Sequence, residues 1–201
     1  YINYHILHMC FSFEVSIGTF IVSWVISLYL LIKRLTKEKQ QHIIFLMIFS
    51  SIQLADAILW YNIMKKNNIN YLVTSYLIPL LLSLQILYMV FIVNHSSFIK
   101  IIDDKYLKIF ISILLLYMFY RFNGYSVSLC NNKLSSPIWG SNEIKLWELV
   151  LMSFLIFYPD YYMWFATLFL FLLIKIFVGG GYGTLWCAIT NLVAFYYLYK
   201  F

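Results

Sequence analysis

The chain has 201 residues, of which 63% are hydrophobic and only 11% are charged, and its mean hydropathy is +0.83. Its 14 basic and 8 acidic residues are too few to cover the core of a water-soluble domain of this size. The net charge of +6 does not favour nucleic-acid binding, because no solvated domain gathers the lysines and arginines. The composition therefore predicts an integral membrane protein.

Long apolar runs separated by short polar clusters follow one another along the chain. A membrane-spanning helix needs about 20 mostly apolar residues, and helices suit lipid because each satisfies its own backbone hydrogen bonds. We therefore predict an all-α fold, a polytopic transmembrane helix bundle of one domain with about seven helices. The predicted helices cover residues 11–32, 42–61, 71–93, 105–120, 144–158, 161–178 and 184–199.

The fifth and sixth of these helices are the least distinct. Only Pro159 and Asp160 separate them, and the fifth begins among Glu143, Lys145 and Glu148. Six helices are therefore the alternative.

The basic residues in the predicted loops indicate an orientation. Lys33, Arg34, Lys37 and Lys39 crowd the first loop, which the positive-inside rule places on the cytoplasmic side. The first eight residues contain no lysine or arginine. We therefore expect a multi-pass protein whose N-terminus lies outside or in a lumen.

Polar side chains recur on one face of three predicted helices. Gln53, Asp56 and Trp60 are spaced by three and four residues, so they share a face of the second helix. Thr184, Cys187 and Asn191 repeat this spacing in the seventh helix, and Glu14 lies early in the first.

The direction of each helix places these groups in the same leaflet, with Glu14, Gln53, Asp56 and Asn191 roughly 7 to 12 Å from the helix ends at 1.5 Å per residue. The pattern predicts one ligand or proton site formed by Glu14, Gln53, Asp56, Trp60, Thr184, Cys187 and Asn191.

The prediction of a ligand or proton site depends mainly on Asp56. An ionised carboxylate inside a bilayer costs about 2.5 to 3.5 kcal/mol and usually marks a functional site. The alternative is interhelical hydrogen bonding, which Gln53, Thr184 and Asn191 also suit. Glu14 can reach the membrane interface, Trp60 suits an interfacial aromatic belt, and Cys187 suits packing.

Motifs for metal, nucleotide or nucleophilic chemistry do not stand out. The histidines are scattered, and the glycines at 179–181 and 183 follow no strand and precede no Lys-Ser/Thr pair. The sequence predicts no metal and no cofactor, and it favours a protein that is not an enzyme.

Three stretches together resemble a known but uncharacterised family of small polytopic membrane proteins from bacteria and giant viruses. They are Met9-Cys10-Phe11-Ser12 with Glu14-Val15-Ser16, the helical stretch Gln53 to Trp60, and Gly183-Thr184-Leu185-Trp186-Cys187. The resemblance implies a membrane location and the same polar residues, with Asp56 where the family often has Glu and Thr184 where it has Ser. It supplies no activity.

Three functions follow from these features. The first is a carrier or channel for protons or a small polar solute, with Asp56 and Glu14 at its site and the lipid bilayer as its surroundings. The second is a structural or assembly protein of a membrane, such as a viral envelope component. The third is a membrane-embedded lipid-modifying enzyme with Cys10 or Cys187 as nucleophile, which we favour least because no His, Lys or Arg is predicted beside either thiol.

Overall fold

The computed structural model describes residues 13–33, 35–62, 67–131, 134–140, 144–178 and 182–201, and side chains 128–137 and 174–188 lie outside this description. The described chain is helical apart from one two-stranded hairpin, so the predicted all-α class is confirmed at that level. The resemblance motif at residues 9–12 and the Thr184 and Cys187 side chains fall outside the described parts.

The first three apolar runs form the longest helical segments. They are α1 (Phe13–Ile32), α2 (Lys37–Asn62) and a continuous stretch, Asn68–Val93. This last stretch consists of α3 (Asn68–Leu72), the π-helical turn η1 (Val73–Leu77), α4 (Ile78–Tyr88) and a second π-helical turn, η2 (Met89–Val93). Pro79 lies in the first turn of α4, where its missing N–H cannot continue the α-helical pattern from the preceding turn.

The remaining elements are shorter. They are α5 (His95–Phe98), α6 (Asp104–Arg121), β1 (Val127–Asn131), β2 (Leu134–Ile138), α7 (Leu146–Phe157), α8 (Tyr161–Val178) and α9 (Tyr182–Lys200). The strands pair antiparallel, with Val127 opposite Ile138. This hairpin lies where the sequence indicated only a connecting loop, because its five-residue strands carry no long periodic pattern.

Three described helical segments are long and apolar enough to cross a bilayer: Phe13–Ile32, Lys37–Asn62 and Asn68–Val93. Leu146–Phe157 and Tyr161–Leu173 are apolar but shorter. At 1.5 Å per residue α7 is about 18 Å long, well below the ~30 Å hydrocarbon core. α7 and α8 are separate helices, and a cis peptide bond precedes Pro159 between them.

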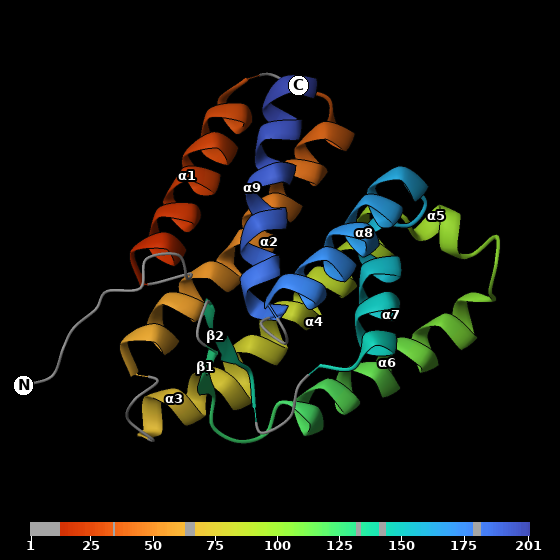
Figure 1. Ribbon diagram of the computed structural model, residues 1–201. Helices are drawn as coiled ribbons and strands as arrows, with labels where there is room; N and C mark the ends of the chain where they lie inside the picture. Colours follow the sequence, from red (N-terminus) through yellow and green to blue (C-terminus); the bar gives the residue numbers. More distant parts are fainter. Residues whose placement is uncertain (1–12, 34, 63–66, 132–133, 141–143, 179–181) are drawn as a thin grey trace, which may run out of the picture.

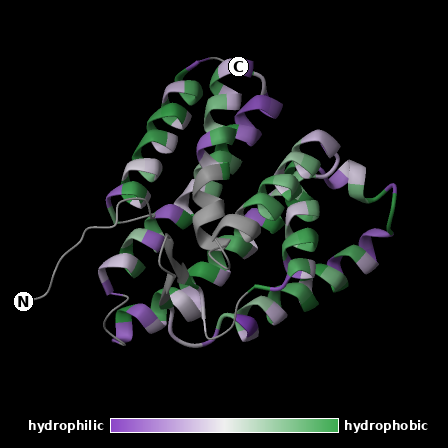
Figure 2. Ribbon diagram, viewed as in Figure 1, coloured by the Kyte–Doolittle hydropathy of each residue, from purple (hydrophilic) through white to green (hydrophobic). Residues whose placement is uncertain are grey.

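Helix packing brings distant parts of the sequence together. α1 packs along α2, and α9 packs against both of them (Figure 1). α4 contacts α2, α6 and α7, while α8 lies between α7 and α9. Hydrophobic residues run along the helices, and hydrophilic ones gather toward many of their ends (Figure 2).

The two ends of the bundle differ. At one end, which we call the basic end, α1 ends, α2 begins and α9 ends, next to Lys33, Lys37, Lys39 and Lys200 (Figure 1). At the other, which we call the hairpin end, α1 begins, α2 ends and the β1–β2 hairpin lies beside them.

The polarity of α1 is reversed relative to a helix of a water-soluble protein. Its buried positions are Ser16, Thr19, Ser23, Ser27 and Leu30. Its exposed face carries large apolar side chains, among them Ile21, Val25, Leu28 and Ile32. A helix in water buries its apolar stripe and exposes its polar one. The arrangement of α1 is therefore suited to an apolar solvent, the lipid bilayer.

Polar contacts attach the segment before β1 to the helix that begins at Asn68. The Asn70 amide donates to the Ser126 carbonyl oxygen at 3.0 Å and accepts from the Ser126 N–H at 2.8 Å. Thr74 Oγ1 lies 2.7 Å from Ser126 Oγ, and Ser75 Oγ donates to the Gly124 carbonyl oxygen at 3.1 Å. Asn70, Thr74 and Ser126 are completely buried, so these bonds replace water as their partners.

Asn70→Ala should lower the free energy of unfolding by about 2 to 4 kcal/mol, because it leaves buried groups of Ser126 without partners at ~1 to 3 kcal/mol each. Reversible unfolding in mixed detergent micelles measures this. Tyr71→Phe is the matched control, since its hydroxyl bonds Asn123 at an exposed site and its loss should cost under about 1 kcal/mol. Equal effects of the two changes would contradict the assignment.

Candidate functional site

Asp56 is a buried carboxylate on α2 near the hairpin end. Only 1% of its surface is exposed, and its Oδ1 accepts a hydrogen bond of 2.7 Å from the indole Nε1 of Trp139. Trp139 directly follows β2, and Gly140 after it has a φ of +77°, a left-handed conformation that favours glycine. The turn after the hairpin thus places the indole N–H of Trp139 inside the bundle, where it donates to Asp56.

The Trp139 indole is itself held in place. It is buried, and its ring centroid lies 6.2 Å from that of Phe122 in an edge-to-face arrangement. β2 also contacts both α2 and α9. Trp139 therefore links the hairpin to the part of the bundle that contains Asp56.

Gln53 lies one turn before Asp56 on the same face of α2 and is completely buried. Within the described chain neither its Oε1 nor its Nε2 has a hydrogen-bond partner. An unpaired buried polar group costs about 1 to 3 kcal/mol. Buried amides are normally hydrogen-bonded, so Gln53 is a candidate for an interaction beyond the described side chains.

Hydroxyl and amide groups on α1 and α9 continue the polar character of this region. Asn191 Nδ2 donates to Thr19 Oγ1 at 3.3 Å, which joins α9 to α1. Within the described residues Ser16 Oγ, Ser23 Oγ and Asn191 Oδ1 have no partner. We call these groups the polar seam, and its members are Ser16, Thr19, Ser23, Gln53 and Asn191.

The structure brings together the three helices that carry the predicted site. Gln53 and Asp56 are buried in α2, whereas Glu14 is exposed in the first turn of α1. Trp60 is half-buried, and its Nε1 has no partner among the described residues. Thr184 and Cys187 belong to α9, but their side chains are not described. A single site formed by all seven residues remains a prediction.

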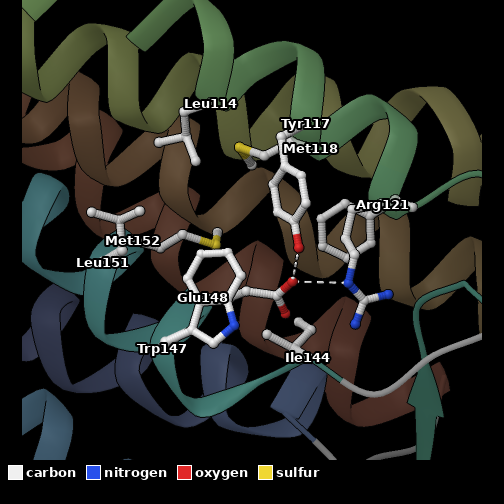
Figure 3. A pocket seen from close by; sticks show the side chains of 10 residues that line it. Leu114, Tyr117, Met118, Arg121, Ile144, Trp147, Glu148, Leu151 and Met152 are labelled. Carbon is white, nitrogen blue, oxygen red and sulfur yellow. Dashed lines mark hydrogen bonds and ion pairs between the residues drawn. The ribbon is translucent and has the colours of Figure 1, made fainter. Parts of the chain in front are cut away.

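Glu148 is a second buried carboxylate. From the sequence it was identified only as one of the charged residues at the start of the fifth predicted helix. Tyr117 Oη and Arg121 Nε both donate to Oε1, the latter at 2.9 Å, and the Lys145 N–H donates to Oε2 at 2.6 Å (Figure 3). The Glu148 and Arg121 side chains are only 5% and 9% exposed. This cluster ties the end of α6 to the start of α7.

A small cavity of about 20 Å³ adjoins this cluster, with Leu114, Ile144, Trp147 and Met152 among its walls (Figure 3). The volume accommodates about one water molecule. Both carboxylate oxygens of Glu148 already accept hydrogen bonds, and the Arg121 guanidinium neutralises the carboxylate charge. In the sequence, the feature that could have indicated this ion pair is an arginine near the end of one predicted helix and a glutamate near the start of the next, 27 positions apart.

Comparison of the chain with models of protein families, with curated proteins and with solved structures finds no match. The resemblance noted from the sequence therefore stays a prediction. The chemistry of Asp56, Gln53 and the polar seam is the basis for inferring a function.

Trp139→Phe should lower the free energy of unfolding by about 1 to 3 kcal/mol, because the buried Asp56 carboxyl loses the indole hydrogen bond. Detergent unfolding measures this. Trp60→Phe is the control on the same helix as Asp56, since its indole N–H has no partner among the described residues. If Trp60→Phe lowers the free energy of unfolding as much as Trp139→Phe does, the loss is caused by the smaller ring, and the hydrogen bond to Asp56 does not contribute.

Glu148→Gln should destabilise the protein by about 3 to 5 kcal/mol, because it leaves the Arg121 charge buried without its carboxylate. The double change Arg121→Met with Glu148→Leu should recover most of that loss, since it removes both charges together. Unfolding free energies of the single and double variants measure the coupling. Independent, additive effects would show that the two side chains do not act as a pair.

Proposed function

We propose that this chain is a multi-pass membrane protein with about seven spans that carries protons or a small polar solute across the bilayer. Asp56 and Gln53 form its binding site. The observation that carries the proposal is a buried carboxylate one helical turn from a buried amide that has no partner among the described residues. Such groups are costly in a membrane and usually serve transport or proton transfer.

The polar seam supports transport because it extends along the bundle. From Ser16 to Ser23 its members on α1 cover about 10 Å at 1.5 Å per residue. Hydroxyl groups both donate and accept hydrogen bonds, so they suit a proton, water or a small hydroxylated solute. A purely structural contact between helices needs fewer such groups.

The distribution of charge supports an orientation. Lys33, Lys37, Lys39 and Lys200 gather at the basic end, and the positive-inside rule would place this end in the cytoplasm. The hairpin end, with Asp56 and Trp139, would then face outside or a lumen. In this arrangement the hydrogen bond between Trp139 and Asp56 would lie in the outer half of the bundle.

A structural or assembly role in a membrane is the second candidate. The hydrogen bond from Asn191 to Thr19 favours it, because amide and hydroxyl groups commonly join membrane helices in this way. In that case the polar seam would only determine helix packing. Removing the Asp56 carboxylate would then change stability alone.

A flux experiment separates the two candidates. Purified protein in liposomes that enclose a pH-sensitive dye should dissipate a pH gradient, and Asp56→Asn should slow this flux at least tenfold. Asp104→Asn, the same change at an exposed carboxylate of α6, should leave the flux unchanged. The unfolding free energy of each variant, measured in parallel, distinguishes lost transport from lost folding.

Two results would contradict the proposal. If wild-type liposomes carry no protons and also do not swell in urea or glycerol, the carrier function is wrong. If flux is present but Asp56→Asn matches wild type, the assignment of the site to Asp56 is wrong. Reduced stability of Asp56→Asn without any flux in wild type would favour the structural role.

A further inference from the structure

A separate cavity of about 280 Å³ lies at the basic end of the bundle. It lies among the first turns of α2, the end of η2, the junction of α7 and α8, and the last turns of α9. Its volume is close to the lower limit of small-molecule pockets, about 300 Å³. His42 on its wall and Asp56 are 14 positions apart on α2, about 21 Å along the helix. The cavity is therefore distinct from the proposed transport site.

The inner wall of this cavity is apolar and its rim is charged. Buried Phe45, Met89, Ile156 and Phe157 supply apolar surface. The exposed lining residues are Glu38, Pro159, Asp160 and Lys200, of which three carry charge. A molecule that fits must therefore be amphipathic, with its polar end at the rim.

The charged groups at the rim have opposite signs but do not pair with one another. Within the described chain no ion pair joins Lys200 to Glu38 or Asp160, and the Glu38 carboxylate has no hydrogen-bond partner. Lys200 Nζ instead donates to Tyr196 Oη at 2.9 Å, and Asp160 Oδ1 accepts from the Met163 N–H at 3.1 Å. The cavity thus offers separate places for a cation and for an anion.

We propose that this cavity binds the headgroup of a zwitterionic phospholipid with a primary ammonium group, of which phosphatidylethanolamine is the simplest. The ammonium group binds Glu38 and Asp160, since its three N–H donors match carboxylate acceptors. The phosphate binds Lys200, and the apolar wall with Phe45 and Phe157 contacts the glycerol and the first acyl carbons.

A lipid fits better than a free solute because of where the cavity lies. Its rim is at the start of α2 and the end of α9, and helix ends are where membrane helices reach the headgroup layer. Tyr196 and Tyr197 line the cavity, and aromatic side chains of this kind are enriched at that level. A free zwitterion would gain nothing from the apolar wall.

Binding to the full chain in detergent tests the proposal with short-chain lipids as probes. Phosphatidylethanolamine should bind at least tenfold more tightly than phosphatidylcholine, whose quaternary ammonium has no N–H, and than phosphatidylglycerol, which has no cation. Glu38→Gln should lower the affinity for phosphatidylethanolamine at least tenfold. Lys100→Gln, an exposed lysine outside the cavity lining, is the control and should change nothing.

Three outcomes would overturn the proposal. Equal affinity for the three lipids would indicate contact with bulk lipid, and an unchanged affinity in Glu38→Gln would remove the ammonium site. Phosphoethanolamine that binds as tightly as the lipid would show that the ligand is a soluble zwitterion. None of these results depends on transport, because the assay measures binding alone and the Asp56 site is not altered.

Discussion

The polar groups of this protein lie where they are expected in helices surrounded by hydrocarbon. With an apolar solvent outside, the hydrophobic effect does not drive helices together, and association depends on close packing and interhelical hydrogen bonds. α1 follows this constraint most clearly, because serines and a threonine form its buried face while isoleucine, valine and leucine are exposed. The same constraint places Gln53 and Asp56 inside the bundle.

The hairpin end shows how a connecting segment becomes part of the interior. Asn70 bonds the backbone of Ser126, Thr74 bonds its hydroxyl, and the Trp139 indole bonds Asp56 from the other end of the hairpin. The hairpin is therefore attached on both sides to helices that are far from it in sequence. Trp139 is therefore both an attachment point of the hairpin and the donor to Asp56.

The two buried carboxylates have different hydrogen-bond partners. Glu148 accepts from a guanidinium, a phenol and a backbone N–H, so its charge is matched by a cation and its position is determined. Asp56 accepts a hydrogen bond from the Trp139 indole and lies one turn from the Gln53 amide, which has no hydrogen-bond partner among the described residues. The ion pair of Glu148 with Arg121 joins α6 to α7, whereas the buried Asp56 carboxyl is the group on which the proposed transport site is based.

The sequence alone predicted the membrane class, the apolar helices and Asp56 as a candidate site residue, because these predictions follow from composition and from 3.6-residue periodicity, which are local properties. It also placed Gln53 on the same face as Asp56. The Trp139 hydrogen bond, the Glu148–Arg121 pair and the cavity at the basic end were not predictable, because each joins residues from separate elements. Only helix packing and the path of the hairpin decide which side chains meet across such distances in the chain. The exposure of Glu14 was decided in the same way, since a residue near a helix end faces the interior only if a neighbouring helix covers it.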